Sequence, residues 1–356
     1  MRRHIDSLGP DVHTIEVSQD GELVNVSSKS EDDETRYICY PLLQDLQKPK
    51  IHEPRIRTVL RAELRELDRL GPNVDLVSYR GRKLVFKYCF WSHQTQLLWD
   101  EINILTLLPL HPNIIPLHWV VVEKLHAQEH IVGFTTRYIA GGNLAAEGRR
   151  VFKLKWLKQL ISVIDDLNHK YGIQHQDVAP NNLLVHEATD KIMLFDFNIA
   201  VRVNAQLESV GAVKCDEGCD VNGVIFTVYE IVTRDYHLRG IEYSRQDISS
   251  ILKMDWVEHP DVRLDRPLAT YKAILDAWVL RRKQRTKEVI TDTSNYINWP
   301  DIPKYRRRAI SGREARANNL QVIEWKRPAQ GKIEEGLCVS ADDTVIKTSN
   351  KAWKSP

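Results

Sequence analysis

The chain has 356 residues, of which 42% are hydrophobic and 28% are charged, and these values predict a soluble globular protein with one large or two modest domains. The formal net charge is +2, so the overall field gives no reason to expect binding to nucleic acid or to a membrane surface. The five cysteines are odd in number and scattered, unlike a secreted disulfide framework, and no apolar run has the length of a signal peptide or a membrane span. We therefore expect an intracellular protein, cytoplasmic or nuclear.

Strands and one helix are expected in the first half of the chain. Residues 1–55 are polar and acidic in places, and we expect a weakly ordered extension there, with a small hairpin at Asp20-Gly21. The pattern then becomes β-like, with turn residues between apolar runs. We expect strands at 74–79, 83–90, 114–122 and 130–138, and a helix at 94–107.

Helices are expected to dominate after the break at Gly141-Gly142. We expect helices at 151–171, 221–233 and 270–282 and a short β pair at 183–186 and 192–195. Beyond residue 285 the chain is basic and turn-rich, which predicts a surface or poorly ordered tail. The chain thus divides into an extension (1–55), a small β-rich part (56–140), a larger helical part (141–285) and a tail (286–356). This is an α+β arrangement of two lobes with a cleft where they meet.

The strongest chemical signal is the stretch His175-Gln176-Asp177, with Asn182 five residues after the aspartate and Asp196 on the far side of the β pair. Phosphoryl transfer needs a carboxylate that accepts the proton of the attacking hydroxyl, and oxygen ligands that hold Mg²⁺ against the phosphates. One His-x-Asp alone is typical of a capped turn. The full spacing, after a helix and across a β pair, favours phosphoryl transfer.

This pattern resembles the catalytic loop H-R-D-x-x-x-x-N and the D-F-G motif of the eukaryotic protein kinase superfamily. The resemblance covers residues 60–282 and is of a divergent kind, similar to kinase-like proteins of filamentous fungi. It implies a bilobal kinase fold, with a β-rich N-lobe carrying an αC helix and a helical C-lobe. It also implies that Asp177 is the catalytic base, that Asn182 and Asp196 are the Mg²⁺ ligands, and that Asp220 anchors the catalytic loop.

The first half of the chain supplies further matches to this superfamily. Leu84-Val85-Phe86-Lys87 resembles the V-A-I-K strand, whose lysine holds the phosphates of ATP, and Glu101 then matches its ion-pair partner on the αC helix. The resemblance also implies an adenine site. Its residues are Val77, Val85, Thr136, Arg137, Ile139 and Leu184. Taken singly, Lys87 and Glu101 are more typical of solvated surface charges, and each residue of the adenine set is equally typical of ordinary core packing.

Several positions depart from the superfamily pattern. Gly71 is one glycine where the phosphate-binding loop has three, so fewer backbone amides can approach a phosphate closely. Gln176 replaces the arginine of H-R-D. Ala179 replaces a lysine whose positive charge lies near the γ-phosphate and stabilises the transition state of phosphoryl transfer. Asn198 stands in place of the glycine of D-F-G, and the stretch from 196 to 220 is short and lacks A-P-E.

Three functions remain open on the sequence. The first is an ATP- and Mg²⁺-dependent protein kinase acting on Ser or Thr of a protein substrate, for which Lys87, Glu101, Asp177, Asn182 and Asp196 are all present. The second is a pseudokinase that serves as an ATP-binding scaffold. The third is an atypical kinase-fold phosphotransferase with a small-molecule substrate. Cys215 and Cys219 are the only close cysteine pair, which is too few ligands for a zinc site.

Overall fold

The structure is a computed structural model of the chain. It describes residues 8, 12, 14–32, 36–47, 56–145, 151–203, 218–241, 245–285, 296–304, 309–325, 337–339 and 345–347. The chain forms two compact units. Unit 1 comprises residues 1–106, 117–138 and 300–356, and unit 2 comprises residues 107–116 and 139–299. The mixed α and β content agrees with the predicted α+β class.

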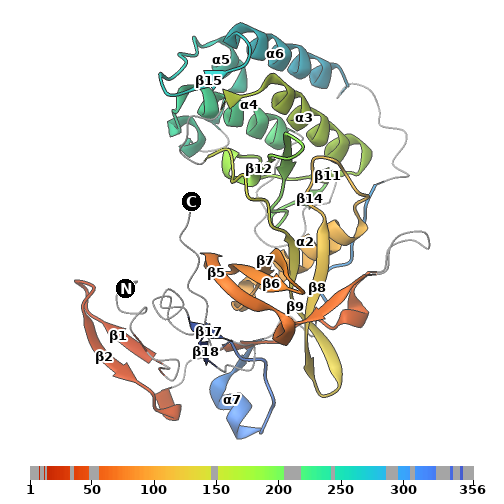
Figure 1. The fold of residues 1–356 in the computed structure, drawn as a ribbon. Coiled ribbons are helices and arrows are strands. Elements are labelled where there is room, and N and C mark those ends of the chain that lie inside the picture. The colour runs from red at the N-terminus through yellow and green to blue at the C-terminus, as the bar shows by residue number, and fades with distance from the viewer. Residues whose placement is uncertain are drawn as a thin grey trace. The chain divides into compact units, whose positions relative to one another are not determined.

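Unit 1 is built on a six-stranded sheet with the strand order β4-β8-β9-β7-β6-β5 (Figure 1). Neighbouring strands are antiparallel except for the parallel pair of β4 and β8. The strands of this sheet are β4 (Thr58–Leu60), β5 (Arg65–Gly71), β6 (Val74–Tyr79), β7 (Arg82–Tyr88), β8 (Leu117–Leu125) and β9 (Gln128–Arg137).

The alternation of side chains explains the neighbouring strands β6 and β7. In β7 the side chains of Leu84, Phe86 and Tyr88 are buried and the residues between them are more exposed, the period of two that a strand requires. The strands join at Arg80 and Gly81, both with positive φ, which is the backbone of a two-residue hairpin turn. The strand predicted at 74–79 is confirmed in full, and the one predicted at 83–90 begins at residue 82 and ends at 88.

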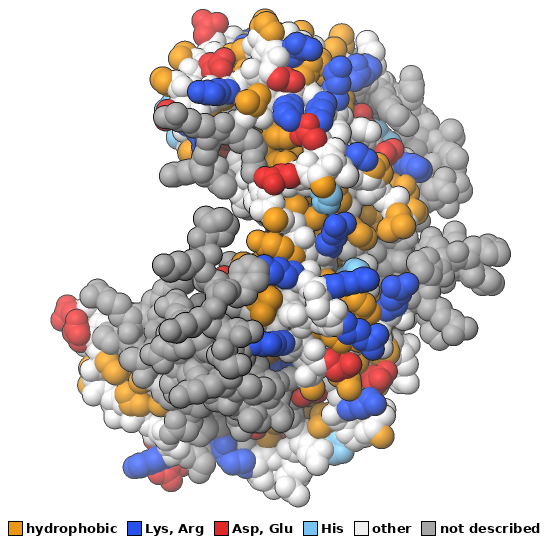
Figure 2. Space-filling view, viewed as in Figure 1, with side chains coloured by type: hydrophobic (Ala, Val, Ile, Leu, Met, Phe, Trp, Pro, Cys, Tyr) orange, Lys and Arg blue, Asp and Glu red, His pale blue; other side chains and the backbone are white. Residues whose placement is uncertain are grey.

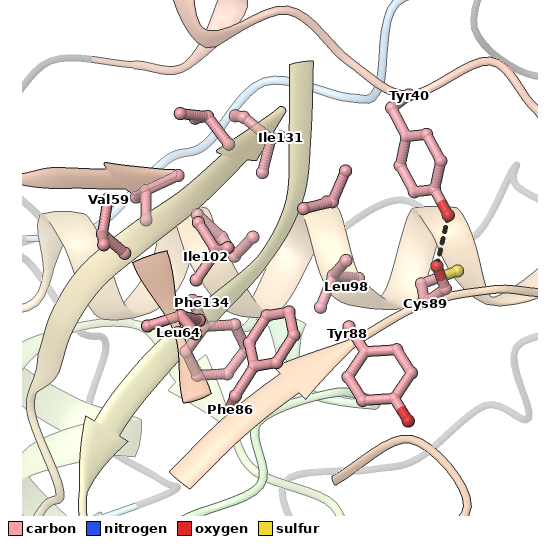
Figure 3. Packing of buried hydrophobic residues seen from close by; sticks show 14 of the residues in the cluster. Tyr40, Val59, Leu64, Phe86, Tyr88, Cys89, Leu98, Ile102, Ile131 and Phe134 are labelled. Atoms are coloured by element: carbon pink, nitrogen blue, oxygen red, sulfur yellow. Dashed lines mark hydrogen bonds between the residues drawn. The ribbon is translucent and has the colours of Figure 1, made fainter. Parts of the chain in front are cut away.

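Helix α2 (Thr95–Leu107) confirms the predicted helix at 94–107 and supplies an apolar face to the core of unit 1. Leu98, Trp99 and Ile102 belong to the same buried cluster as Phe86 and Tyr88 of the sheet. Figure 3 shows Leu98 and Ile102 on the helix among the aromatic rings of the strands. Burial of these side chains ties the helix to the strand that carries Lys87.

The two flanks of the chain contribute to unit 1 as well. The predicted N-terminal hairpin is present, and residues 36–38 pair with residues 309–311 in a separate antiparallel sheet. Ile302 and Ile323 lie in the core at 3% and 6% exposure, so part of the region predicted as a tail is packed and buried. The flanking elements are β1 (Thr14–Val17), β2 (Leu23–Ser27), β3 (Arg36–Ile38), β16 (Ala309–Ser311), α7 (Gly312–Ala317), β17 (Leu337–Val339) and β18 (Val345–Lys347).

Unit 2 is mainly helical, as the sequence predicts. Its helices are α3 (Leu154–Asp165), α4 (Gly218–Thr233), α5 (Ile248–Lys253) and α6 (Leu268–Arg285). Its short strands are β10 (Val151–Phe152), β11 (Ile173–Gln174), β12 (Leu183–His186), β13 (Lys191–Leu194), β14 (Val201–Arg202) and β15 (Arg263–Leu264). The helix predicted at 151–171 starts at Leu154 and, after Asp165, continues as a π-helical turn over Asp166–Lys170.

Helix α4 lies at the centre of unit 2. All seven residues from 224 to 230 are buried, and a helix that is buried on every side is a core helix. The β pair predicted at 183–186 and 192–195 is also present, as β12 and β13, with Leu183 opposite Leu194. These elements hold the loop between β11 and β12, which carries the catalytic motif of the sequence.

On the face shown in Figure 2, acidic and basic side chains occur together, in keeping with the formal net charge of +2. In the part of the chain that the structure describes, none of the helices combines the length and the apolar character that crossing a membrane requires.

Candidate functional site

The carboxylate of Asp220 binds the backbone at the start of the loop from His175 to Asn182. Asp220 lies in the first turn of α4 and is fully buried. Its Oδ2 accepts hydrogen bonds from the backbone N–H of His175 at 2.9 Å and from Asn168 Nδ2 at 2.7 Å, and its Oδ1 accepts from the backbone N–H of Gln176 at 2.7 Å. Gln176 has φ = +65°. The hydrogen bonds that the backbone N–H groups of His175 and Gln176 donate to Asp220 stabilise this backbone conformation just before Asp177. This agrees with the anchoring role expected of Asp220.

The imidazole of His175 links this loop to the segment that follows β13 and contains Asp196. Its Nδ1 faces the backbone N–H of Asp177 at 3.3 Å, so Nδ1 is the acceptor. Nε2 then carries the proton and donates to the carbonyl oxygen of Phe195 at 3.0 Å. The ring also packs edge-on against Phe197, with 4.6 Å between centroids. The histidine therefore connects the two motif segments by side-chain contacts.

Asp177 and Asn182 are in direct contact. Asn182 Nδ2 donates to Asp177 Oδ2 at 2.7 Å and to the Asp177 carbonyl oxygen at 2.9 Å. Asn182 is buried, whereas Asp177 is half-buried. The amide of Asn182 therefore fixes the orientation of the Asp177 carboxylate.

Asp196 is positioned at the same end of the β12–β13 pair as Asn182. Leu183 pairs with Leu194, and the N–H of Phe195 donates to the carbonyl oxygen of Asn182 at 3.2 Å. Asp196 is the next residue and has φ = +68°, a conformation that a non-glycine residue adopts at a cost. The sheet pairing therefore brings Asp177, Asn182 and Asp196 to one region of unit 2.

One face of α4 supports the catalytic loop along its length. Gly223, one turn after Asp220, lies so close to the loop that an added Cβ would be 2.8 Å from Val178 Cβ. One turn further on, Thr227 Oγ1 donates to the carbonyl oxygen of Val178 at 3.2 Å. Arg239 Nη1 donates to the same oxygen at 3.2 Å while its guanidinium group holds the buried Glu230. Val178 directly follows Asp177, so these contacts fix the backbone beside the Asp177 carboxylate.

Unit 1 holds the second set of predicted residues. Lys87 Nζ on β7 lies 2.7 Å from Glu101 Oε2 on α2, with side-chain exposures of 17% and 2%. The pairing inferred from the resemblance is therefore present in the structure. The turn between β5 and β6 lies next to this strand, since Val74 pairs with Lys87 and Asn73 Nδ2 donates to the Tyr88 carbonyl oxygen at 3.1 Å.

The strand register separates the predicted adenine contacts. Val85 is opposite Thr136 on β9 and opposite Leu76 on β6, so the side chains of these three residues share one face of the sheet. Val77 is opposite Leu84 and is 2% exposed within the core cluster, on the other face. Grouping Val77 with Val85 therefore needs correction, because successive residues of a strand point to opposite faces. Leu76, opposite Val85, is the residue of β6 that shares its face of the sheet.

The other predicted adenine contacts lie at the ends of elements. Arg137 is the last residue of β9, and its side chain is exposed. In unit 2, Ile139 is buried and Leu184 is half-buried on β12, where it bridges to Asn143.

The donor set of unit 2 suits Mg²⁺. Asn182 Oδ1 and the Asp196 carboxylate are hard oxygen ligands, and Mg²⁺ is usually held by one or two such groups together with water and phosphate oxygens. Among the described residues, no cluster of three or more His, Cys, Asp or Glu side chains could hold a metal by itself. The two oxygen ligands, Asn182 and Asp196, would need water or phosphate oxygens to complete the coordination of Mg²⁺. The pair Cys215 and Cys219 and the stretch 204–217 lie outside the residues whose side chains are described.

Sequence reasoning missed the supports of the catalytic loop. Gly223, Thr227 and Glu230 follow Asp220 at helical spacing, so the periodicity of α4 could have indicated them. Arg239 carries no such signal, because it comes from a separate turn and reaches a carbonyl 61 positions earlier in the chain.

Two comparisons with known proteins both find similarity to protein kinases. The protein kinase domain family model matches residues 80–254. The chain is 35% identical over 105 residues to CBL-interacting protein kinase 5 of Oryza sativa subsp. japonica, which is 28% of this chain and 21% of that protein. It is 31% identical over 121 residues to CBL-interacting serine/threonine-protein kinase 20 of Arabidopsis thaliana, 32% of this chain and 26% of that protein. The alignments thus span about a fifth to a quarter of these relatives.

Proposed function

This chain belongs, through residues 80–254, to the eukaryotic protein kinase superfamily, and from that premise we propose that it is an ATP- and Mg²⁺-dependent kinase that phosphorylates Ser or Thr hydroxyls of a protein substrate. The observation that carries the proposal is the contact between Asn182 Nδ2 and Asp177 Oδ2 at 2.7 Å, within a loop whose backbone N–H groups at His175 and Gln176 donate to the Asp220 carboxylate. A carboxylate oriented in this way can accept the proton of an attacking hydroxyl.

Asp177 acts as the base in this proposal. The amide of Asn182 holds one carboxylate oxygen, so the other oxygen is left to receive a proton from the substrate hydroxyl. The support of the Val178 backbone by Thr227 and Arg239 limits movement of the loop. Positioning of this kind supplies much of the rate in phosphoryl transfer, where the protein takes little part in covalent chemistry.

Lys87 binds the phosphates of ATP in this proposal, and Glu101 sets the position of its ammonium group. A lysine on a strand is a compact positive charge on a flexible stem, so a buried carboxylate at 2.7 Å restricts it to one location. The backbone of Arg137 and Ile139, with Val85, Thr136 and Leu184, is proposed to bind adenine. Leu76 joins this set and Val77 leaves it, on the strand register.

Asn182 and Asp196 are the residues that would hold Mg²⁺ through their side-chain oxygens. When bound, the ion supplies positive charge that offsets the charge of the phosphate oxygens. The Ser/Thr specificity and the protein nature of the substrate are supported by the names of the relatives, which include serine/threonine-protein kinases.

A second candidate, a pseudokinase that binds ATP without turnover, is favoured by one observation. Ala179 is 4% exposed and is followed by Pro180, so the position at which related kinases have a lysine offers no charge to the transferring phosphate. The turn at Gly71 to Val74 also has one glycine for phosphate approach.

The experiment that separates these candidates measures Mg·ATP affinity and ATP turnover for four proteins. They are the wild type, Lys87→Met, Asp177→Asn and, as a matched control, Asp276→Asn at an exposed position of α6. An active kinase predicts that Asp177→Asn binds Mg·ATP within about threefold of wild type and loses turnover by about 10²-fold or more. Lys87→Met should lose affinity, and the control should match wild type.

Equal turnover in all four proteins would contradict the enzyme assignment, and binding without any turnover that depends on Asp177 would establish the pseudokinase. A substrate screen that compares Ser- and Thr-containing peptides with small alcohols then tests the third possibility, a phosphotransferase for small molecules.

A further inference from the structure

A segment outside the matched kinase domain packs against both elements that carry the Lys87–Glu101 ion pair. This C-terminal segment comprises residues 300–304 and 309–325. It is attached to the rest of unit 1 by the pairing of β16 with β3, in which Ala309 is opposite Ile38, and by the burial of Ile302 and Ile323. Its position is therefore set by backbone pairing as well as by apolar contact.

The first contact of this segment is with helix α2. Trp99 is 1% exposed, and its Nε1 donates to the carbonyl oxygen of Pro300 at 2.8 Å. Trp99 lies two residues before Glu101 on the same helix. A buried indole N–H without a partner would be costly, so the hydrogen bond opposes rotation or sliding of α2 relative to residue 300.

The second contact is with strand β7. The Trp325 ring stacks on Tyr88 with 4.5 Å between centroids and an interplanar angle of 15°, and it lies 6.3 Å from Phe86 in a second stacked pair. Phe86 and Tyr88 flank Lys87, so their side chains point to the face of the sheet opposite to the lysine. Trp325 thus packs on β7 beside Lys87, on the face of the sheet opposite to the lysine side chain.

Two further contacts hold the Trp325 ring in place. Trp325 Nε1 donates to the hydroxyl oxygen of Tyr40 at 2.6 Å, and that hydroxyl donates to the carbonyl oxygen of Cys89 at 2.6 Å. Figure 3 shows the second of these bonds, from Tyr40 to the end of the strand. The Arg61 guanidinium group also lies 4.4 Å from the indole ring. The ring is therefore linked, through Tyr40, to the backbone of Cys89, the residue that directly follows the strand on which the ring stacks.

From these contacts we propose that Trp325 and Trp99 are positioning residues for the Lys87–Glu101 ion pair. One holds the strand that carries the lysine, the other holds the helix that carries the glutamate, and the C-terminal segment joins the two. This inference rests on the proposed function, because it assigns the segment a part in nucleotide binding. Ordinary core packing would give the same burial but would not couple Trp325 to Glu101.

A double-mutant cycle measures that coupling directly. Mg·ATP affinity is determined for the wild type, Trp325→Ala, Glu101→Gln and the double variant. We expect Trp325→Ala to weaken binding about tenfold in the wild-type background and about twofold or less when Glu101 is already replaced. Trp325→Phe, which keeps a stacking ring, should restore affinity to within about threefold of wild type. The same factor in both backgrounds would overturn the proposal.

The matched control is Trp91→Ala, which removes an indole from the connection between β7 and α2. Trp91 is 50% exposed and stacks on His93. Its loss should leave Mg·ATP affinity near the wild-type value. If Trp325→Ala does not fold, Trp99→Phe decides instead, since it keeps a ring in the core and removes only the N–H donated to Pro300. Its effect should likewise disappear in the Glu101→Gln background, and persistence of the effect there would overturn the proposal.

Hydrogen exchange of the α2 backbone amides gives a readout that needs no nucleotide. We expect faster exchange over residues 98–107 in Trp325→Ala than in Trp91→Ala, and equal rates would contradict the positioning role. A normal Mg·ATP affinity of Glu101→Gln would contradict the proposed function alone, since faster exchange of α2 would still show that the segment positions the helix.

Discussion

The guanidinium group of Arg239 donates two hydrogen bonds to the carboxylate of Glu230, from Nε to Oε1 at 2.6 Å and from Nη2 to Oε2 at 3.0 Å. The third nitrogen, Nη1, donates to the carbonyl oxygen of Val178, next to Asp177. Glu230 belongs to the buried helix α4, so this one side chain connects the core of unit 2 to the backbone of the catalytic loop. The planar fork of an arginine makes this possible, and a lysine could not reproduce it.

Arg239→Lys tests this connection. The lysine keeps the charge beside Glu230, so we expect a loss of about 1–2 kcal/mol in the free energy of unfolding, which thermal denaturation can measure. Under the proposed function, turnover should fall about tenfold while Mg·ATP affinity changes little, because the loop moves and the nucleotide contacts stay. Arg245→Lys, at an exposed position, is the control. Unchanged turnover in Arg239→Lys would show that the contact with Val178 does not position Asp177.

Gly223→Ala tests the close approach of α4 to the same loop. In an open helix interior, glycine to alanine stabilises by about 1 kcal/mol. Here the new Cβ would meet Val178 Cβ at 2.8 Å and the Val178 carbonyl oxygen at 3.0 Å, so we expect destabilisation and reduced turnover instead. Gly240→Ala, where an added Cβ meets no atom within 4 Å, should leave both quantities unchanged. A more stable Gly223→Ala protein with normal turnover would contradict the expected steric conflict.

The sequence predicted those features that depend on local pattern. The spacing of Asp177, Asn182 and Asp196 spans one loop and one β pair, and the period of helix α2 placed Glu101 on it. It missed contacts between distant segments. The bond from Trp325 to Tyr40 joins residues 285 positions apart, and no periodicity indicates such a pair. The match to the family motif also placed Val77 on the wrong face of the sheet. A motif gives the place of a residue in the chain, but the pairing of β6 with β7 decides which face of the sheet its side chain occupies.

Gly133→Ala tests the packing of β9 behind the backbone of Lys87. A Cβ at residue 133 would lie 2.3 Å from the carbonyl oxygen of Lys87 and 2.7 Å from a ring atom of Phe86. The carbonyl is backbone and cannot rotate away, so the strands must separate. We expect a loss of about 2–3 kcal/mol in the free energy of unfolding and weaker Mg·ATP binding. Gly71→Ala, with its nearest neighbour at 3.8 Å, is the control for stability in the same sheet, and equal stability of the two variants would refute the prediction.

The buried thiol of Cys89 predicts a loss of stability at alkaline pH. Burial raises the pKa of this thiol from its ordinary value of 9.0 to about 11, against the opposing hydrogen bonds to Thr95 and to the Trp91 backbone. Between these two values the unfolded chain releases the thiol proton and the folded chain keeps it, so stability falls as the pH rises through that window. Two pKa units correspond to about 2–3 kcal/mol.

Chemical denaturation from pH 8 to pH 10.5 measures this effect as the difference between wild type and Cys89→Ala. The comparison is needed because burial also raises the pKa of Tyr40, whose hydroxyl donates to the Cys89 carbonyl oxygen. Tyr40 is present in both proteins, so its contribution largely cancels. We expect the unfolding free energy of wild type to fall more steeply with pH than that of Cys89→Ala. Parallel curves would mean that the thiol ionises at the same pH in the folded and unfolded chains, contrary to its burial beneath Tyr40.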